Sequence, residues 1–141
     1  MMNKLMTRFF ICISLFLSAQ AYAEVSVIVS TNNANAAIDE NTLSRIFLGK
    51  TSSFPDGSQS IPVDQNEGAA ARDSFNETVL GKNANQLKAY WSRLIFTGKG
   101  TPPKESGNDT DIKALVANNP NLIGYIDSSA VDGTVKVVYT F

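Results

Sequence analysis

The sequence predicts an α/β fold, a small mixed sheet flanked by helices, from two observations. Short segments rich in Val and Ile, typical of strands, occur at 24–31, 61–63, 121–126 and 134–141. Segments with apolar residues three and four positions apart, typical of helices, lie between them. No repeat or linker interrupts this order. We therefore expect one domain over residues 24–141, with helices on both faces of its sheet.

The first 23 residues have the features of a secretory signal peptide. Lys4 and Arg8 precede an apolar run, Phe9 to Ala19, that is short for a membrane span. Small residues at positions 21 and 23 fit a cleavage before Glu24. We expect export to the periplasm and no stable membrane insertion after cleavage. The alternative is that the segment remains as an uncleaved anchor.

The composition excludes several kinds of site. The one cysteine, Cys12, lies in the predicted signal peptide, and the chain has no histidine. Disulfides, Ser-His-Asp and Cys-His catalysis and the usual zinc sites are therefore excluded for the exported form. No calcium loop of spaced Asp residues appears, so we predict neither a metal nor a cofactor.

The charge balance argues against nucleic acid or an anionic membrane as a partner. The predicted signal peptide holds two of the 12 basic residues and none of the 13 acidic ones. The exported form therefore has a net charge of −3. It also lacks the run of basic residues that binding to a polyanion requires.

Cap residues and glycines indicate where the first two helices begin and end. Asp39 precedes a short helix that ends near Gly49. A second helix is predicted over 67–80, and Gly81 closes it.

The longest helix is expected to follow Asn83 and Gln86, which match a capping box. Its apolar residues fall at helical spacing on one stripe: Leu87, Tyr90, Trp91, Leu94 and Ile95. Because the stripe accounts for both aromatic residues, we expect them in the core and not stacked on a ligand. A loop follows over 97–108, where two consecutive prolines prevent a helix, and Asn108 or Asp109 caps the next helix.

Alternation predicts the two faces of the last strand. Val135, Val137 and Tyr139 should share one face, and Val138 and Thr140 the other. This division assumes an uninterrupted strand of period two.

The segment VDQNEGAAARDSF (63–75) indicates the end of a strand followed by the start of a helix. Such a junction can hold an anion, because free backbone N–H groups and the helix dipole point at one spot. Asp64 and Asn66 are candidate caps, and Gly68 permits close approach to the backbone. Three alanines, 69–71, stand where such a seat usually carries hydroxyls. The sequence leaves open whether an anion binds there.

Four phrases, in this order and spacing, resemble the phosphate-binding proteins of ABC transporters. They are LSRIFLGK (43–50), PVDQNEGAAARDSF (62–75), YWSRLIFTGKGTPP (90–103) and VANNPNLIGYID (116–127). The resemblance covers nearly the whole exported chain. It implies one lobe of a type 2 periplasmic binding protein fold, in a short form without the partner lobe that closes on the ligand.

The resemblance also implies which residues would meet an anion. In the family, an Arg and then a Ser-Gly-Thr at the helix start contact phosphate. Gln65 stands at the Arg position and residues 69–71, all alanine, at the Ser-Gly-Thr position, followed by Arg72. Charged hydrogen bonds of this kind contribute about 1.5–3 kcal/mol each. Losing three of them would weaken an anion site by several powers of ten.

Two functions remain open, and a third is ranked below them. The first is a binding module for phosphate, another small anion or another small ligand, in which Arg72 replaces the missing cation if it turns inward instead of toward solvent. Its candidate residues are Gln65, Asn66, Gly68, Ala69, Ala70, Ala71 and Arg72, with Thr31 and Asn32 after the first strand. The second is a structural or interaction protein of the cell envelope that has lost anion binding and docks on a partner or self-associates. We do not expect an enzyme, because Asp64, Glu67 and Asp73 fit caps and first-turn acids better than a catalytic carboxylate pair.

Overall fold

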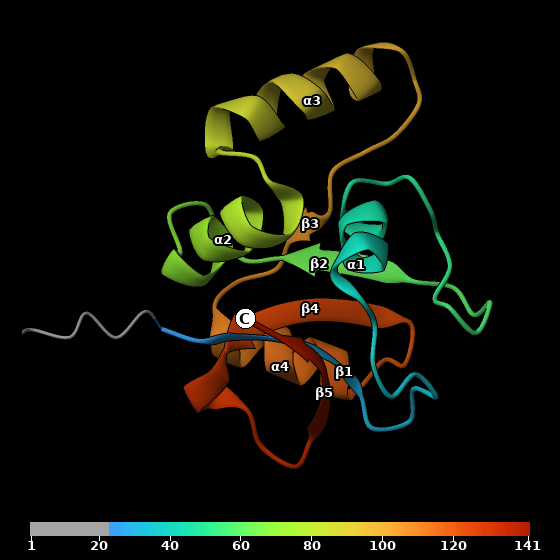
Figure 1. Cartoon of the computed structure of the whole chain (residues 1–141), viewed down its shortest axis with the longest axis vertical. Coiled ribbons are helices and arrows are strands. Elements are labelled where there is room, and N and C mark those ends of the chain that lie inside the picture. The colour runs from blue at the N-terminus through green and yellow to red at the C-terminus, as the bar shows by residue number, and fades with distance from the viewer. Residues whose placement is uncertain (1–22) are drawn as a thin grey trace, which may run out of the picture.

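A computed structural model describes residues 23–141 of the chain as a mixed five-stranded sheet with helices packed against it (Figure 1). The predicted signal peptide therefore lies, except for Ala23, outside the described residues. No helix in the described part of the chain is long and apolar enough to span a membrane. The elements are β1 (Val25–Ser30), α1 (Glu40–Phe47), β2 (Ile61–Asp64), α2 (Ala70–Phe75), the π-helical turn η1 (Asn76–Leu80), α3 (Ala84–Phe96), β3 (Lys104–Glu105), α4 (Asp109–Ala117), β4 (Leu122–Asp127), the 3₁₀ turn η2 (Ser128–Ala130) and β5 (Val135–Thr140).

The strand order is β3-β2-β4-β1-β5, and it confirms the predicted mixed α/β fold. Strand β2 runs parallel to β3 and β4, whereas β1 runs antiparallel to β4 and β5. The carboxyl ends of β2 and β4 therefore lie on the same side of the molecule as the amino end of β1. Strand β3 was not predicted, since its two residues lie in the expected 97–108 loop. It forms because the chain returns beside β2 and pairs Val63 with Lys104.

Helices cover both faces of the sheet, as predicted. On one face α1, α2 and η1 enclose Leu43, Phe47, Phe75 and Tyr125, none of them more than 2% exposed. On the other face Ile112 of α4 packs against apolar residues of the sheet. Gly124 makes this contact possible, because a Cβ there would lie 2.7 Å from the Ile112 Cγ2 atom.

Most of the predicted caps are present. Asp39 accepts a hydrogen bond from the backbone of Thr42, and Asn83 with Gln86 forms the expected capping box. Asn108, not Asp109, caps α4. Gly81 closes η1 in the left-handed conformation that glycine adopts without strain.

Helix α2 begins at Ala70, so the prediction of a helix from residue 67 is wrong at its start. Neither Asp64 nor Asn66 caps it: the cap position is Ala69, which offers no side-chain oxygen. The backbone of Asn66 instead donates to the carbonyl of Gly107, 3.0 Å away, and Gly68 has a φ of 89°. This hydrogen bond and the positive φ of Gly68 hold residues 65–68 in a loop, so the first helical turn begins later in the chain.

A β-bulge in β5 corrects the predicted faces of the last strand. Val27 pairs with Tyr139 and Ile28 with Val137, which leaves Val138 without a partner on β1. The extra residue reverses the alternation, so Tyr139 packs beside Val138 against the α1–α2 face instead of beside Val137. The carbonyl of Val138 accepts from the backbone of Ile38. The bulge is thus held by a segment 100 residues away in sequence.

Helix α3 stands apart from the sheet, and the prediction that its aromatic stripe is core is wrong (Figure 1). Leu87 is its one buried residue, while Tyr90 and Trp91 are half-buried. Tyr90 donates from its hydroxyl to the carbonyl of Leu48, 2.6 Å away. The apolar stripe is buried or half-buried from Leu87 to Leu94 and is open at Ile95, which is 54% exposed.

Candidate functional site

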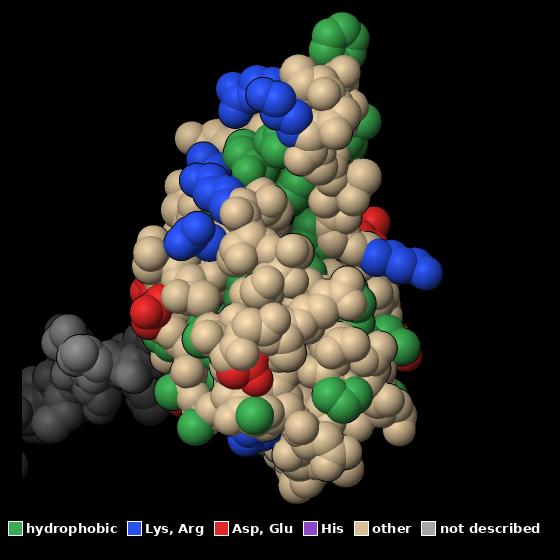
Figure 2. Space-filling view, turned by 90° about the vertical axis from the view of Figure 1, so that its right-hand side faces the viewer, with side chains coloured by type: hydrophobic (Ala, Val, Ile, Leu, Met, Phe, Trp, Pro, Cys, Tyr) green, Lys and Arg blue, Asp and Glu red, His purple; other side chains and the backbone are tan. Residues whose placement is uncertain are grey.

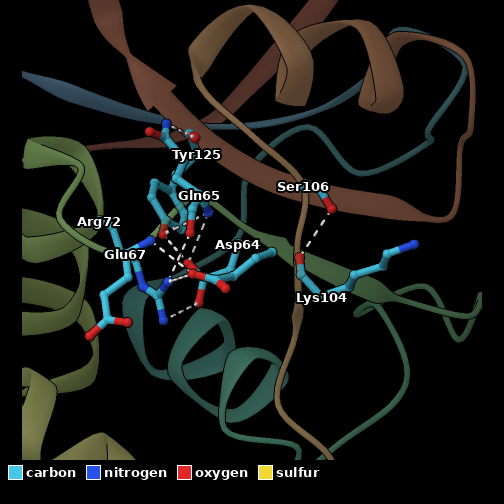
Figure 3. Close-up of polar contacts among 8 residues, drawn as sticks. Asp64, Gln65, Glu67, Arg72, Lys104, Ser106 and Tyr125 are labelled. Atoms are coloured by element: carbon cyan, nitrogen blue, oxygen red, sulfur yellow. Dashed lines mark hydrogen bonds and ion pairs between the residues drawn. The ribbon is translucent and has the colours of Figure 1, made fainter.

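Four segments meet where β2 ends, and their polar side chains form one cluster (Figure 3). Asp64 is the last residue of β2, Tyr125 comes from β4, Glu105 from β3 and Arg72 from the first turn of α2. The parallel pairing of β2 with β3 sets Asp64 opposite Glu105 in register. Asp64, Glu105 and Tyr125 were not among the predicted site residues.

Arg72 turns inward, one of the two orientations that the sequence left open. Its guanidinium lies 3.6 Å from the Asp64 carboxylate and 2.5 Å from the Glu105 carboxylate. It also donates to the carbonyl of Gln65 at 2.9 Å. Figure 3 shows the guanidinium turned toward Asp64, while Lys104 points away from the cluster. Arg72 is therefore the cation of this cluster.

The Glu105 carboxylate accepts two hydrogen bonds at one oxygen. The backbone N–H of Glu67 donates from 2.8 Å and the Arg72 guanidinium from 2.5 Å. These two bonds lower the pKa of Glu105 below its usual value of 4.5, so the group stays ionised at neutral pH. A backbone amide and a guanidinium that converge on one carboxylate oxygen form a small anion seat, here filled by the chain itself.

Asp64, whose side chain is 14% exposed, is held by a different set of partners. The Tyr125 hydroxyl and the Gln65 backbone N–H both donate to its Oδ1 atom. Burial raises the pKa of Asp64, and the Tyr125 hydrogen bond and the charge of Arg72 only partly offset this effect. Burial and the neighbouring Asp64 charge also raise the pKa of Tyr125, which therefore remains a hydrogen-bond donor. For Arg72, burial opposes the charge, but the two carboxylates outweigh it and raise the pKa.

Gln65, at the position that the resemblance assigned to an anion-binding Arg, makes internal contacts. Its side chain is 3% exposed. Its Nε2 atom donates to Asp109 at 2.7 Å and to the carbonyl of Tyr125 at 2.9 Å. Asp109 in turn accepts from the backbone of Asp127. Gln65 thus ties β2 to β4 and to the start of α4.

The remaining predicted residues of this segment lie near the cluster without contributing polar side-chain contacts. Asn66, Gly68 and Ala70 are exposed, and Ala69 is half-buried. Ala71 packs against the core beneath α2. As the alanines at 69–71 indicate, these positions offer only backbone groups and small apolar side chains to the site, and no hydroxyl.

Thr31 and Asn32 are not brought to this cluster. They follow β1, which runs antiparallel to β4 and β2. They therefore lie at the opposite ends of the strands from the carboxyl end of β2. Ser30, just before them, bonds to the carbonyl of Ala117 at the far end of α4. Sequence reasoning grouped them with 65–72 because both segments follow strands, and it could not tell the direction of β1.

A groove of about 360 Å³ runs from the cluster along α2 to α3. Asp64, Glu67, Asp73, Arg72 and Lys88 line its polar parts, and Phe47, Phe75, Trp91 and Ile95 its apolar parts. Its carboxylates outnumber its cations, so the potential in the groove opposes a free anion. Within residues 23–141, no group of three or more His, Cys, Asp or Glu side chains is placed to hold a metal ion.

Comparison with solved structures places the fold. A putative phosphate ABC transporter substrate-binding protein with bound phosphate from Clostridium perfringens matches 83% of this chain with 26% identity and a TM-score of 0.66. An ABC-type phosphate transport receptor from Vibrio cholerae matches 83% with 18% identity and a TM-score of 0.64. PstS from Borrelia burgdorferi matches 82% with 11% identity and a TM-score of 0.61. The predicted resemblance to phosphate ABC transporter substrate-binding proteins is therefore confirmed.

The matches span between 45% and 47% of these three proteins, so this chain corresponds to about half of each. No protein-family model matches the chain, and no curated protein sequence matches it. The similarity thus establishes a fold shared with one half of these phosphate ABC transporter proteins.

Proposed function

We propose that this chain is an exported, noncatalytic binding module that takes a small oxyanion, phosphate or a close relative of it, at the seat between the Glu67 amide and the Arg72 guanidinium. In this proposal the chain's own Glu105 carboxylate competes with the ligand. The proposal draws on the phosphate-binding proteins with which the chain shares its fold.

One observation carries the proposal. The Glu67 N–H and the Arg72 guanidinium converge on a single oxygen of Glu105, at 2.8 and 2.5 Å. These donors suit any carboxylate, phosphate or sulfate oxygen, because each such group presents the same charged acceptor. Glu105 is about half-exposed, with 51% of its side chain accessible, so it can swing away without unfolding the strand.

The same geometry implies weak binding. Asp64 remains beside Arg72 at 3.6 Å and Glu67 lies at the seat, so an incoming anion meets two negative charges. The hydroxyls and the additional cation of the resembling family are missing at residues 69–71 and at Gln65. We expect a phosphate dissociation constant of about 1 mM or weaker for the unaltered protein.

The test is phosphate titration of the exported form and of Glu105→Ala, followed by NMR amide shifts and thermal unfolding. Removing the competing carboxylate should tighten phosphate binding by about tenfold to a hundredfold, since one charged hydrogen-bonding partner is worth about 1.5–3 kcal/mol. The amide of Glu67 should shift most. Arg72→Ala should abolish binding in both backgrounds.

A matched control uses a second acid on the same groove. Asp73→Ala removes an exposed carboxylate that makes no hydrogen bond to Glu67 or Arg72, so it should change the affinity much less than Glu105→Ala. If neither the exported form nor Glu105→Ala responds to phosphate, sulfate or carboxylates, the anion-binding proposal fails.

A second function, an interaction protein of the cell envelope, is favoured by a separate observation. Ile95 and Phe96 of α3 are 54% and 91% exposed, which is unusual for large apolar residues on one helix end. Such a surface suits a protein contact. The two functions involve different parts of the molecule and do not exclude each other.

A further inference from the structure

The segment that protrudes from the sheet also differs from it in charge. We call residues 81–101, which comprise α3 and its two connections, the α3 arm, and the other described residues the body. The arm holds four basic residues and no acidic one: Lys82, Lys88, Arg93 and Lys99. The body holds six basic residues and all 13 acidic ones. Figure 2 shows Lys and Arg side chains gathered over the upper part of the molecule, where α3 lies, with a hydrophobic side chain at its tip.

The exposed large apolar residues of the described chain fall into two patches. Ile95 and Phe96 form the first, at the end of the arm. Ile61 and Leu115, 37% and 43% exposed, form the second on the body. No element among residues 23–141 covers either patch.

The body patch is a groove and not a flat surface. Ile61 and Leu115 line a cavity of about 400 Å³ together with Pro62, Pro102, Pro103 and Leu122. A second hollow of about 540 Å³ adjoins it, sharing Leu115 and Leu122 and bordered by Asp111. The groove is therefore apolar at its centre, with one basic residue, Lys104, in its lining and one acidic residue, Asp111, on the rim of the adjoining hollow.

We propose that the arm is a docking element for a second copy of this chain, with Ile95 and Phe96 of one copy entering the groove around Ile61 and Leu115 of the other. The two patches are both apolar, so contact between them removes both from water. The charges of the arm and the body are opposite: the arm carries +4, and the body, with six basic and 13 acidic residues, carries −7. The positive arm is attracted to the negative body of the partner, which steers and orients the encounter.

A second copy fits these observations better than a lipid surface. The exported form has a net charge of −3, so an anionic bilayer would repel the body that carries the arm. A bilayer would also leave the groove uncovered. Exchange of arms between two copies covers both patches twice, and a two-fold arrangement closes without open ends.

The first test is sedimentation velocity of the exported form over a range of concentrations. We expect a monomer–dimer equilibrium in which Phe96→Asp weakens dimerisation at least tenfold and Leu115→Asp does the same. Ala89→Asp is the matched control, because it adds the same charge to an exposed position of α3 outside the apolar patch, and it should leave the dimer intact. Raising the salt concentration to about 0.5 M should weaken the dimer, since screening acts on the charged rims.

A crosslink tests the contact itself, independently of how well each variant folds. The exported form has no cysteine, so Phe96→Cys and Leu115→Cys can be introduced one at a time. Under oxidising conditions a mixture of the two variants should give a covalent dimer joined through positions 96 and 115. Leu115→Cys alone should give far less.

A monomer at every concentration, or a mixed crosslink no stronger than that of either variant alone, would overturn the proposal. The proposal would also be overturned, in favour of a lipid surface, if the monomer bound to phosphatidylglycerol vesicles and Phe96→Asp lost this binding. The inference names a partner for the interaction function and does not depend on anion binding. Phe96→Asp should therefore leave the phosphate response of Glu105→Ala unchanged, so that failure of one proposal can be told from failure of the other.

Discussion

The sheet core and the α3 arm have similar apolar patterns but differ in how completely those patterns are buried. Every residue of β1 is buried, and Phe75 stacks on Tyr125 with ring centroids 4.2 Å apart and an interplanar angle of 7°. In the arm, Trp91 is half-buried and Phe96 is 91% exposed. The difference shows that an apolar stripe predicts that a helix face or strand will be covered, but does not say which part of this chain, or which other molecule, covers it. In the core the chain supplies the whole contact, whereas in the arm it supplies only part of it and leaves Ile95 and Phe96 uncovered by the described residues.

The largest expected effect contrasts an aromatic residue of each region. Phe75→Ala should lower the free energy of unfolding by about 3–5 kcal/mol, because it leaves a cavity between Phe47 and Tyr125. Trp91→Ala should cost about 1–2 kcal/mol, because the indole is only partly buried. Urea unfolding of the two variants measures both values. Equal losses would contradict the distinction between core and arm.

A smaller loss of stability is expected when the hydrogen bonds of Gln65, which join β2 to β4 and to the start of α4, are removed. Gln65→Leu keeps the volume but leaves Asp109 and the carbonyl of Tyr125 without their donor, so it should cost about 1–3 kcal/mol. The neighbouring Asn66→Ala, at an exposed position, should change stability by less than about 0.5 kcal/mol. Equal values for the two variants in thermal unfolding would show that Gln65 does not tie the elements together.

The pH dependence of anion binding offers an effect of about tenfold, or ~1.4 kcal/mol. The folded pKa of Glu105 lies below its usual value of 4.5, so its stabilising contacts are complete above that value and are lost as the pH falls through the lower, folded pKa. The competing carboxylate then becomes neutral. Burial raises the pKa of Asp64, so Asp64 gains its proton at a higher pH than a free aspartate does, and its protonation also releases Arg72.

Sulfate is the suitable probe, since its charge stays constant above about pH 3.5, so a change of affinity with pH reports carboxyl groups of the protein and not the ligand. Its affinity should rise as the pH falls, and in Glu105→Gln the rise should be smaller and confined to the titration of Asp64. Isothermal titration calorimetry across this range would measure it. A pH-independent affinity in the unaltered protein would argue that neither carboxylate competes with the ligand.

The smallest expected effect is on the stability of the single chain at the tip of the arm. Phe96→Ser should change the unfolding free energy of the monomer by less than about 0.5 kcal/mol, because the ring is almost wholly exposed. Thermal unfolding at low protein concentration, where any dimer is dissociated, is the measurement. A loss above about 1 kcal/mol would mean that Phe96 packs against its own chain and that the arm is not free to dock.

The sequence was informative where a structure depends on near neighbours. The capping box of Asn83 and Gln86 joins residues three apart, and the glycine at 81 needs only its own backbone conformation. It was misleading where a neighbour far along the chain decides the outcome. Alternation could not show that Val138 would bulge, because the bulge is held by the distant Ile38.

The candidate site divides in the same way. The sequence located Arg72 and the alanines at 69–71, and with them the absence of hydroxyls. It could not find Glu105, because nothing local marks a two-residue strand after two prolines. Glu105 meets Arg72, 33 residues earlier, only after β3 pairs with β2.

The sequence by itself determined the fold class, the helices and strands other than β3 and the start of α2, and the lack of histidine and of cysteine outside the predicted signal peptide. These follow from periodicity, capping and residue chemistry, which act within a few positions of the chain. The tertiary structure decided that Arg72 faces two carboxylates and that Gln65 ties three elements together. It also placed Thr31 and Asn32 at the other end of the strands and left the stripe of α3 only partly covered. Each of these depends on strand direction, pairing register or the course of a connection, and these are settled only when distant segments pack together.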